Sequence, residues 1–133
     1  MPKKFDYEEA LNAILEQHPD IRFRRFHIYK SEDDTSKEYG GAVVAFKKIN
    51  NTKIMAFSFK SPKDKYIEAK GRFIAASRLI HKDAMARGHL HKVNIATYGA
   101  TETTTASERV RQVICGIIIE KHIYWAMNSP FIV

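Results

Sequence analysis

The sequence predicts an α+β fold in which helices pack against a small antiparallel sheet built on a central β-hairpin. Two apolar runs separated by a short polar turn, at about 41–60, indicate the hairpin. Two longer segments with apolar residues at helical spacing, at about 62–87 and about 107–127, indicate a long middle helix and a C-terminal helix. A chain of 133 residues with 44% hydrophobic content can bury one core, so we expect a single domain over 1–133.

A first helix is expected over residues 6–20. Asp6 is a suitable N-cap, and Glu8 and Glu9 follow in the first turn, where the helix dipole favours negative charge. Pro19 cannot continue a helix and is expected to end it. We expect this helix to pack on the sheet.

A half-buried strand is expected over residues 21–30, where apolar residues such as Phe26 alternate with polar ones. The adjacent Arg24 and Arg25 interrupt this alternation, which is compatible with a β-bulge. Residues 31–41 are polar and acidic, so a loop is expected there. The acidic residues of this segment could suggest a metal site, but the segment lacks the glycine and the distal glutamate spacing of a calcium-binding loop, so we expect no metal site.

The central hairpin has its strands in the segments GAVVAFKKIN and TKIMAFSFK. The turn between them contains asparagines, and asparagine tolerates the positive φ that tight hairpins require. The apolar residues on both sides of the turn can face a core.

The middle helix is expected to begin at Pro62 and to end at Gly88, a suitable C-cap. Gly71 inside it costs about 1 kcal/mol relative to alanine, which indicates close approach of another element or of a ligand. Winding at about 100° per residue gathers basic side chains on one face. These are Lys63, Lys70, Arg78 and Lys82.

A fourth strand is expected over residues 93–100, and the last helix follows over about 107–127 with Ser107 as its cap. The many β-branched residues in this segment also suit a strand, which stays open as the competing structure.

The charge of the chain favours an anionic partner. Lys and Arg number 22 against 15 Asp and Glu, which gives a net charge of +7 and a pI of about 9.5. Basic side chains displace condensed counterions from phosphates, so we expect a nucleic acid or a nucleotide as partner. Mimicry of DNA, which needs strong negative charge, is excluded.

The compartment expected from the sequence is the cytoplasm. The single Cys115 excludes an intramolecular disulfide and a cysteine-based zinc site, and it suits a reducing environment. No apolar run reaches the roughly 18 residues of a membrane span, and the first residues do not resemble a secretory signal. We take a homodimer as the default state because isologous dimers are common.

No Walker loop, G-x-G-x-x-G, zinc-finger or RNP-like motif is present. Basic residues that could bind phosphate instead fall into three groups: Arg22, Arg24 and Arg25; Lys63, Lys70, Arg78 and Lys82; and Arg109 with Arg111. Side chains placed by the fold, together with helix N-termini, would then hold the phosphate. The candidates are Arg24, Arg25, Lys63, Lys70, Arg72, Arg78, Arg109 and Arg111.

Candidate catalytic residues are the histidines His89, His91 and His122. A histidine beside a basic phosphate site can act as a general acid or base in a metal-free phosphodiesterase. Their spacing is not H-E-x-x-H, so neither a metal nor a cofactor is expected. Cys115 lies in the most apolar segment and is expected to be a buried hydrophobe rather than a nucleophile.

One segment, SPKDKYIEAKGRFIAASRL, resembles a segment of small, mostly uncharacterised bacteriophage-encoded proteins. In these proteins an aromatic strand runs into Pro-Lys-Asp, and a Lys/Arg-Gly-Arg-x-Ile-Ala-x-x-Arg block follows. The matching positions are Pro62, Lys63, Asp64, Tyr66, Lys70, Gly71, Arg72, Ile74, Ala75 and Arg78. The resemblance implies a phage origin, a hairpin-then-helix unit and a role in host takeover or counter-defence inside the host cell cytoplasm.

The function expected from these observations is non-enzymatic binding of a phosphate-bearing ligand, either nucleic acid or nucleotide. Two alternatives stay open. The first is a protein that inhibits a host or defence enzyme by direct contact, with a host protein as its partner. The second is the histidine-dependent, metal-free phosphodiesterase.

Overall fold

The computed structural model describes residues 5–50, 52–60, 65, 67–94, 106–121 and 131–133. Within these ranges the chain forms three helices and five strands, which confirms the expected α+β class. In chain order they are α1 (Tyr7–Gln17), β1 (Arg22–Ser31), β2 (Asp34–Ile49), β3 (Thr52–Lys60), α2 (Glu68–Ile80), β4 (His91–Asn94), α3 (Ala106–Lys121) and β5 (Phe131–Ile132).

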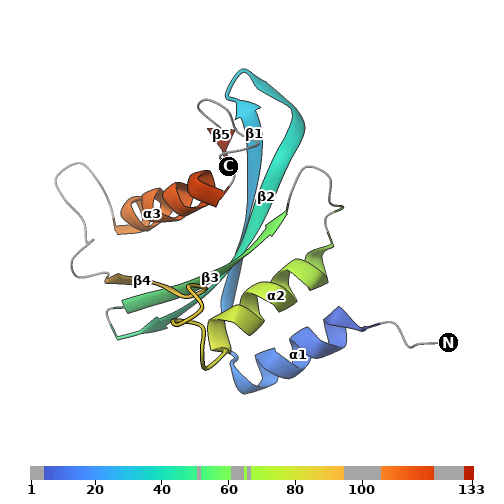
Figure 1. Ribbon diagram of the computed structural model, residues 1–133, viewed down its shortest axis with the longest axis vertical. Coiled ribbons are helices and arrows are strands. Elements are labelled where there is room, and N and C mark those ends of the chain that lie inside the picture. Colours follow the sequence, from blue (N-terminus) through green and yellow to red (C-terminus); the bar gives the residue numbers. More distant parts are fainter. Residues whose placement is uncertain (1–4, 51, 61–64, 66, 95–105, 122–130) are drawn as a thin grey trace.

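The five strands form one antiparallel sheet in the order β4-β3-β2-β1-β5. Figure 1 shows α1 and α2 side by side on one side of the sheet and α3 on the other. Both faces are therefore covered by helices, and each face has an apolar core of its own.

The two cores follow from the alternation of side chains along the strands. The α3-side core contains strand residues Phe26, Ile28, Ala42, Val44, Met55, Phe57 and Ile132 together with Val110, Ile114 and Ile118 of α3. The α2-side core contains Ile21, Val43, Ala45, Ala56, Ala75 and Leu79. Successive residues of β2 thus point into different cores, which is why its apolar run is almost continuous.

Helix α1 begins as expected, because Asp6 accepts a hydrogen bond from the Glu9 N–H through its carboxylate at 3.1 Å. The helix ends at Gln17, two residues before Pro19. It packs along α2 through ring contacts of Phe5 and Tyr7 with Phe73.

The middle helix is shorter than the expected 62–87. It begins at Glu68, because the N-cap residue Ile67 is extended with φ −125° and ψ 111°, and residues 61–64 and 66 lie outside the described part. It ends at Ile80, since His81 turns to ψ 130° and its Nδ1 accepts the Asp83 N–H at 3.1 Å. Gly88, with φ +70°, closes a separate turn instead of the helix.

Two expectations about β1 and β2 are wrong. Strand β2 begins at Asp34, inside the expected loop 31–41, and pairs back onto β1. Pairing is regular at Arg24 and Arg25, and the register shifts come later, between Ile28 and Ser31. Regular alternation instead places Arg24 and Arg25 on opposite faces of the sheet, Arg24 on the α3 side and Arg25 on the α2 side.

The last segments are described in part. Strand β4 covers His91–Asn94, and the rest of the expected strand 93–100 lies outside the described residues. The helix prevails over the competing strand in α3, where Val110, Ile114 and Ile118 are buried four residues apart. The expected helix residues 122–127 lie outside the described part. In the described ranges, no helix combines the length and the apolar character needed to cross a membrane.

Candidate functional site

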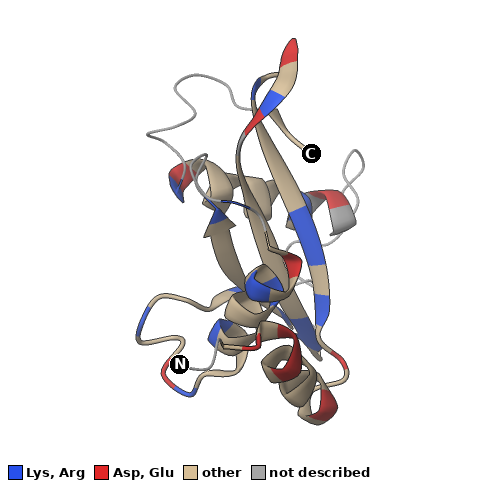
Figure 2. Ribbon diagram, turned by 90° about the vertical axis from the view of Figure 1, so that its right-hand side faces the viewer, with Lys and Arg blue, Asp and Glu red and all other residues tan. Residues whose placement is uncertain are grey.

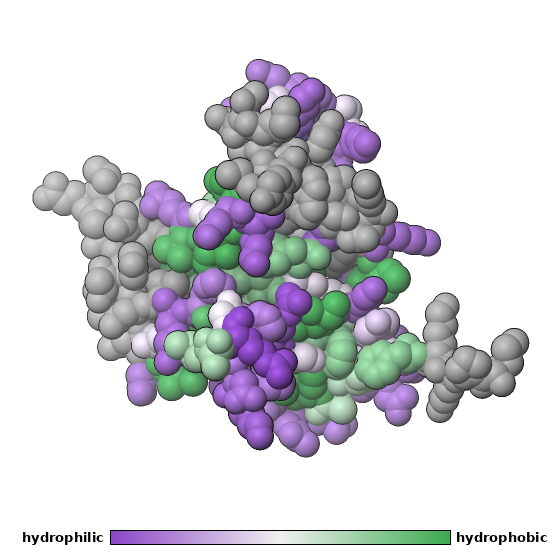
Figure 3. All heavy atoms as spheres, viewed as in Figure 1, coloured by the Kyte–Doolittle hydropathy of each residue, from purple (hydrophilic) through white to green (hydrophobic). Residues whose placement is uncertain are grey.

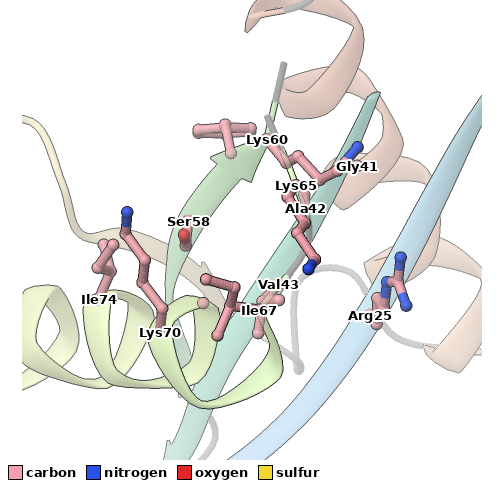
Figure 4. A pocket seen from close by; sticks show the side chains of 12 residues that line it. Arg25, Gly41, Ala42, Val43, Ser58, Lys60, Lys65, Ile67, Lys70 and Ile74 are labelled. Atoms are coloured by element: carbon pink, nitrogen blue, oxygen red, sulfur yellow. The ribbon is translucent and has the colours of Figure 1, made fainter. Parts of the chain in front are cut away.

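A pocket of about 480 Å³ opens between the start of α2 and the sheet (Figure 4). Strands β1, β2 and β3 supply one wall, and α2 with the residues just before it supplies the other. The lining residues are Arg25, Gly41, Ala42, Val43, Ser58, Phe59, Lys60, Lys65, Ile67, Lys70, Gly71 and Ile74.

The sheet wall is set by strand register. Val43 pairs with Arg25 on one side and with Ser58 on the other, so these three side chains share the face toward α2. Two residues away along the same face, Gly41 pairs with Lys60. A side chain at Gly41 would be tightly crowded, because its Cβ would lie 3.0 Å from the Phe26 carbonyl oxygen and 3.0 Å from Glu38 Oε1.

Four cationic side chains line the pocket, and each comes from a different segment. Arg25 belongs to β1, Lys60 to β3 and Lys70 to α2, while Lys65 precedes α2. In the view of Figure 4, Lys65 lies over β2, between Lys70 and Arg25. Among the lining residues, all from the described part of the chain, there is no Asp or Glu. The pocket is therefore strongly electropositive.

One carboxylate stands beside the pocket. Glu38 Oε2 is 3.5 Å from Arg25 Nη2, and Glu38 Oε1 is 3.2 Å from His27 Nδ1. Lys70 Nζ is 5.8 Å from the centre of the Tyr7 ring, a cation–π contact. Arg25 is thus oriented by an internal anion and Lys70 by an aromatic ring.

Polar groups other than the cations also face this region. Ser58 is only 9% exposed, and its hydroxyl can donate or accept a hydrogen bond. The start of α2 adds the positive end of the helix dipole, since Ile67 has no side chain that can accept from the first N–H groups.

The pocket also has an apolar side, formed by Ile67 and Ile74. Ile67 is 48% exposed, and Figure 3 shows apolar side chains interspersed with hydrophilic ones over this face of the molecule. A ligand here would meet charge on one side and apolar surface on the other.

The structure brings two of the eight predicted phosphate-binding residues, Arg25 and Lys70, into this pocket. Arg72 lies nearby, but its Nη2 is 2.8 Å from Glu68 Oε1 and its guanidinium stands 5.5 Å from the Phe23 ring centre. Arg78 donates from Nη1 to the Phe57 carbonyl oxygen at 2.7 Å, which ties α2 to β3.

Two other predicted residues lie on the opposite face of the sheet. The Arg24 guanidinium stands 4.9 Å from the centre of the Phe26 ring. Arg111 donates from Nη2 to the Ile132 carbonyl oxygen at 3.0 Å and so ties α3 to β5. Lys63 and the side chain of Arg109 lie outside what the structure describes. The three predicted basic groups therefore do not form one site among the described residues.

The described candidate histidines do not line the pocket. The His91 ring packs edge-on against Phe57 at 5.5 Å, and burial lowers the pKa of His91, with Glu120 opposing the shift. Partial desolvation also lowers the pKa of His89, with the positive charges of Arg78 and others adding to it. His122 lies outside the described residues, and within them no three metal-binding side chains gather.

Sequence reasoning missed two of the four pocket cations, Lys60 and Lys65, and the wall residues Gly41 and Ser58. Counting the register outward from the hairpin turn would have placed Lys60 opposite Gly41. Helical winding from Pro62 would put Lys65 on the far flank of the helix, but the helix does not begin until Glu68.

The arrangement can hold an anion through charge, through a hydroxyl and through the start of a helix, and it can cover an apolar group beside that anion. Its cations are placed by strand pairing and by α2, so most of the site is preformed. Comparison of the chain with protein-family models, with curated proteins and with solved structures finds no match.

Proposed function

We propose that this protein is a non-enzymatic binding protein for a small phosphate-bearing ligand, with a nucleotide as the class of ligand that suits its pocket. The observation that carries the proposal is the convergence of Arg25, Lys60, Lys65 and Lys70 on a pocket whose described lining has no carboxylate. Glu38 offsets part of the charge of Arg25, and a bound anion with several charges would offset more of the repulsion among the four cations.

Phosphate suits the pocket better than a single carboxylate does. A phosphate group offers several acceptor oxygens and more than one negative charge, which can be shared among several cations. The Ser58 hydroxyl and the start of α2 add donors of the kind that phosphate oxygens use. Ile67 and Ile74 supply apolar surface for the remainder of the ligand.

The size of the pocket favours a small molecule over a polymer. Its volume of about 480 Å³ falls within the range of roughly 300–1,000 Å³ typical of small-molecule sites. Binding without turnover is supported by the lining itself, which holds cations, one hydroxyl and apolar groups. Among the described residues, the histidines and carboxylates, which are the usual general acids and bases, stand outside it.

The test uses the variant Lys65→Gln/Lys70→Gln, which removes two charges and keeps most of the side-chain length. Isothermal titration calorimetry with inorganic phosphate, AMP, ADP and ATP would measure affinity. For the parent protein we expect tighter binding with each added phosphate, and for the variant a loss of about tenfold or more for each nucleotide.

The matched control is Lys82→Gln/Arg87→Gln, which removes the same charge from exposed positions after α2. This control should leave the affinity within about twofold of the parent. The proposal fails if a nucleoside without phosphate binds as tightly as the nucleotide, or if the pocket variant behaves like the control. Mass spectrometry of small molecules released when the purified protein is denatured would identify the ligand.

A further inference from the structure

A second group of cations lies at the hairpin end of the sheet, on the face opposite the pocket. Alternation along β1 places Arg22 and Arg24 on the same face as Phe26, whose ring belongs to the α3-side core. The same rule places Lys48 with Phe46, and Lys53 with Met55. Figure 2 shows basic residues in bands along the strands, in contrast to the acidic α1.

Strand register arranges these cations around one aromatic ring. Phe46 pairs with Arg22 on β1 and with Met55 on β3. Lys48 follows two residues along the same face, and Lys48 pairs directly with Lys53. Like charges directly opposite each other destabilise a sheet, so this pairing is unfavourable for the free protein. We call this group, Arg22, Arg24, Lys48 and Lys53 around Phe46, the hairpin basic surface.

Aromatic rings, rather than carboxylates, are the neighbours of Lys53 and Arg24. Arg22 instead donates from Nη1 to the Pro19 carbonyl oxygen at 3.2 Å. Lys53 Nζ stands 4.5 Å from the centre of the Phe46 ring, and Arg24 stands 4.9 Å from the centre of the Phe26 ring. Within the described part of the chain, Arg24, Lys48 and Lys53 form no ion pair. The adjacent Lys47 points to the other face and does have a counter-charge, Asp20, at 3.5 Å.

The electrostatics of Lys53 agree with this geometry. Its pKa is lowered first by partial desolvation and then by the positive charges of Lys48 and Arg24. An anion placed among the three side chains would relieve the repulsion between them.

We propose that the hairpin basic surface binds the phosphodiester backbone of single-stranded nucleic acid, separately from the pocket on the other face. Cations spread over the three strands β1, β2 and β3 suit the repeated phosphates of a chain better than one compact anion. A phosphate near Lys53 would draw its ammonium away from Phe46, because a charge-assisted hydrogen bond is stronger than a cation–π contact. The uncovered ring could then stack with a base, and stacking on aromatic side chains is how many proteins hold single strands.

The first test compares Lys48→Gln/Lys53→Gln with the parent protein by fluorescence anisotropy of a labelled oligothymidylate at several salt concentrations. We expect affinity at low salt to fall about tenfold or more. The slope of log K against log salt should fall by about 0.7 for each lost phosphate contact, hence by about 1.4 for two. The variant removes a repulsive pair, so it should unfold at no lower denaturant concentration than the parent.

Two further variants show whether binding of the oligothymidylate is specific to this surface. Lys82→Gln/Arg87→Gln removes the same net charge elsewhere and should leave oligothymidylate binding within about twofold of the parent. The pocket variant Lys65→Gln/Lys70→Gln should also retain oligothymidylate binding, whatever it does to nucleotides. If either variant weakens oligothymidylate binding as much as Lys48→Gln/Lys53→Gln does, a binding surface separate from the pocket is ruled out.

The preference for single strands is tested by Phe46→Leu, which keeps an apolar side chain and removes the ring. We expect this variant to bind oligothymidylate several-fold more weakly than the parent does. Its affinity for a duplex of the same length as the oligothymidylate should equal that of the parent. The proposal is overturned if the parent binds no oligothymidylate. It is also overturned if the parent binds the duplex as tightly as the single strand.

Discussion

The two faces of the sheet are packed in different ways. On the α3 side, large side chains fill the space, and Phe26, Met55 and Ile118 are each 0% exposed. On the α2 side, the fully buried residues are alanines, among them Ala45, Ala56 and Ala75. Small residues let the backbone of α2 approach the strands closely, and the pocket opens where the chain enters α2. One face therefore provides bulk apolar burial, while the other combines a thinner core with a binding cavity.

The largest effect should come from the α3 side. Phe26→Ala removes a fully buried ring and should lower the free energy of unfolding by about 3–5 kcal/mol, as measured by urea denaturation. Phe23→Ala, on the same strand but on the α2 side, truncates a half-buried ring and serves as the control. The contrast between the faces would be refuted if the two substitutions cost the same.

An intermediate effect on stability should distinguish α2-side residues that stabilise the fold from those that bind the ligand. Arg78→Met removes the 2.7 Å hydrogen bond to the Phe57 carbonyl, so it should lower the free energy of unfolding by about 1.5–3 kcal/mol. Calorimetric titration should show unchanged nucleotide affinity, because Arg78 does not line the pocket. Lys70→Gln should weaken nucleotide binding and leave the free energy of unfolding unchanged. A loss of nucleotide affinity in Arg78→Met with no loss of stability would mean that Arg78 binds ligand instead.

The smallest effect should be on the pH dependence of stability, and it should come from His91 on the α3 side. The pKa of His91 lies below its ordinary value of 6.5, chiefly because of burial, so the unfolded chain binds a proton there more readily than the folded one. The stabilising effect of a neutral His91 is present above pH 6.5 and is lost as pH falls through 6.5 toward the lowered pKa. The thermal unfolding temperature of His91→Gln should therefore fall less steeply between neutral and mildly acidic pH than that of the parent. Equal slopes would show that His91 is not responsible.

The sequence predicted what local patterns decide, and it failed where the answer depends on distant partners. The α+β class and the Asp6 cap follow from residues close together in the chain. The start of α2 was misplaced because Pro62 resembles a helix start, whereas Ile67 is extended. That error removed Lys65 from the site.

The roles of the arginines needed three-dimensional contacts. Neighbouring Arg24 and Arg25 point to opposite faces of the sheet, Arg24 toward the Phe26 ring and Arg25 into the pocket, and the sequence does not show which face carries the pocket. In the sequence, Arg78 and Arg111 cannot be distinguished from the basic residues of the pocket. In the structure, each donates a hydrogen bond to a backbone carbonyl oxygen. Charge alone could not separate a cation that ties elements together from one that faces a cavity.

The pairing of β1 with β5 has a consequence for the order of folding. Strands β1, β2 and β3 follow one another through short connections, whereas Ile28 pairs with Ile132, roughly 100 residues away. Contacts between distant residues carry a larger loop-closure entropy cost and form later. We therefore expect the three-stranded meander to collapse first with α1 and α2, leaving the aromatic side chains of the opposite face uncovered until α3 and β5 arrive. In that interval the chain is most exposed to aggregation.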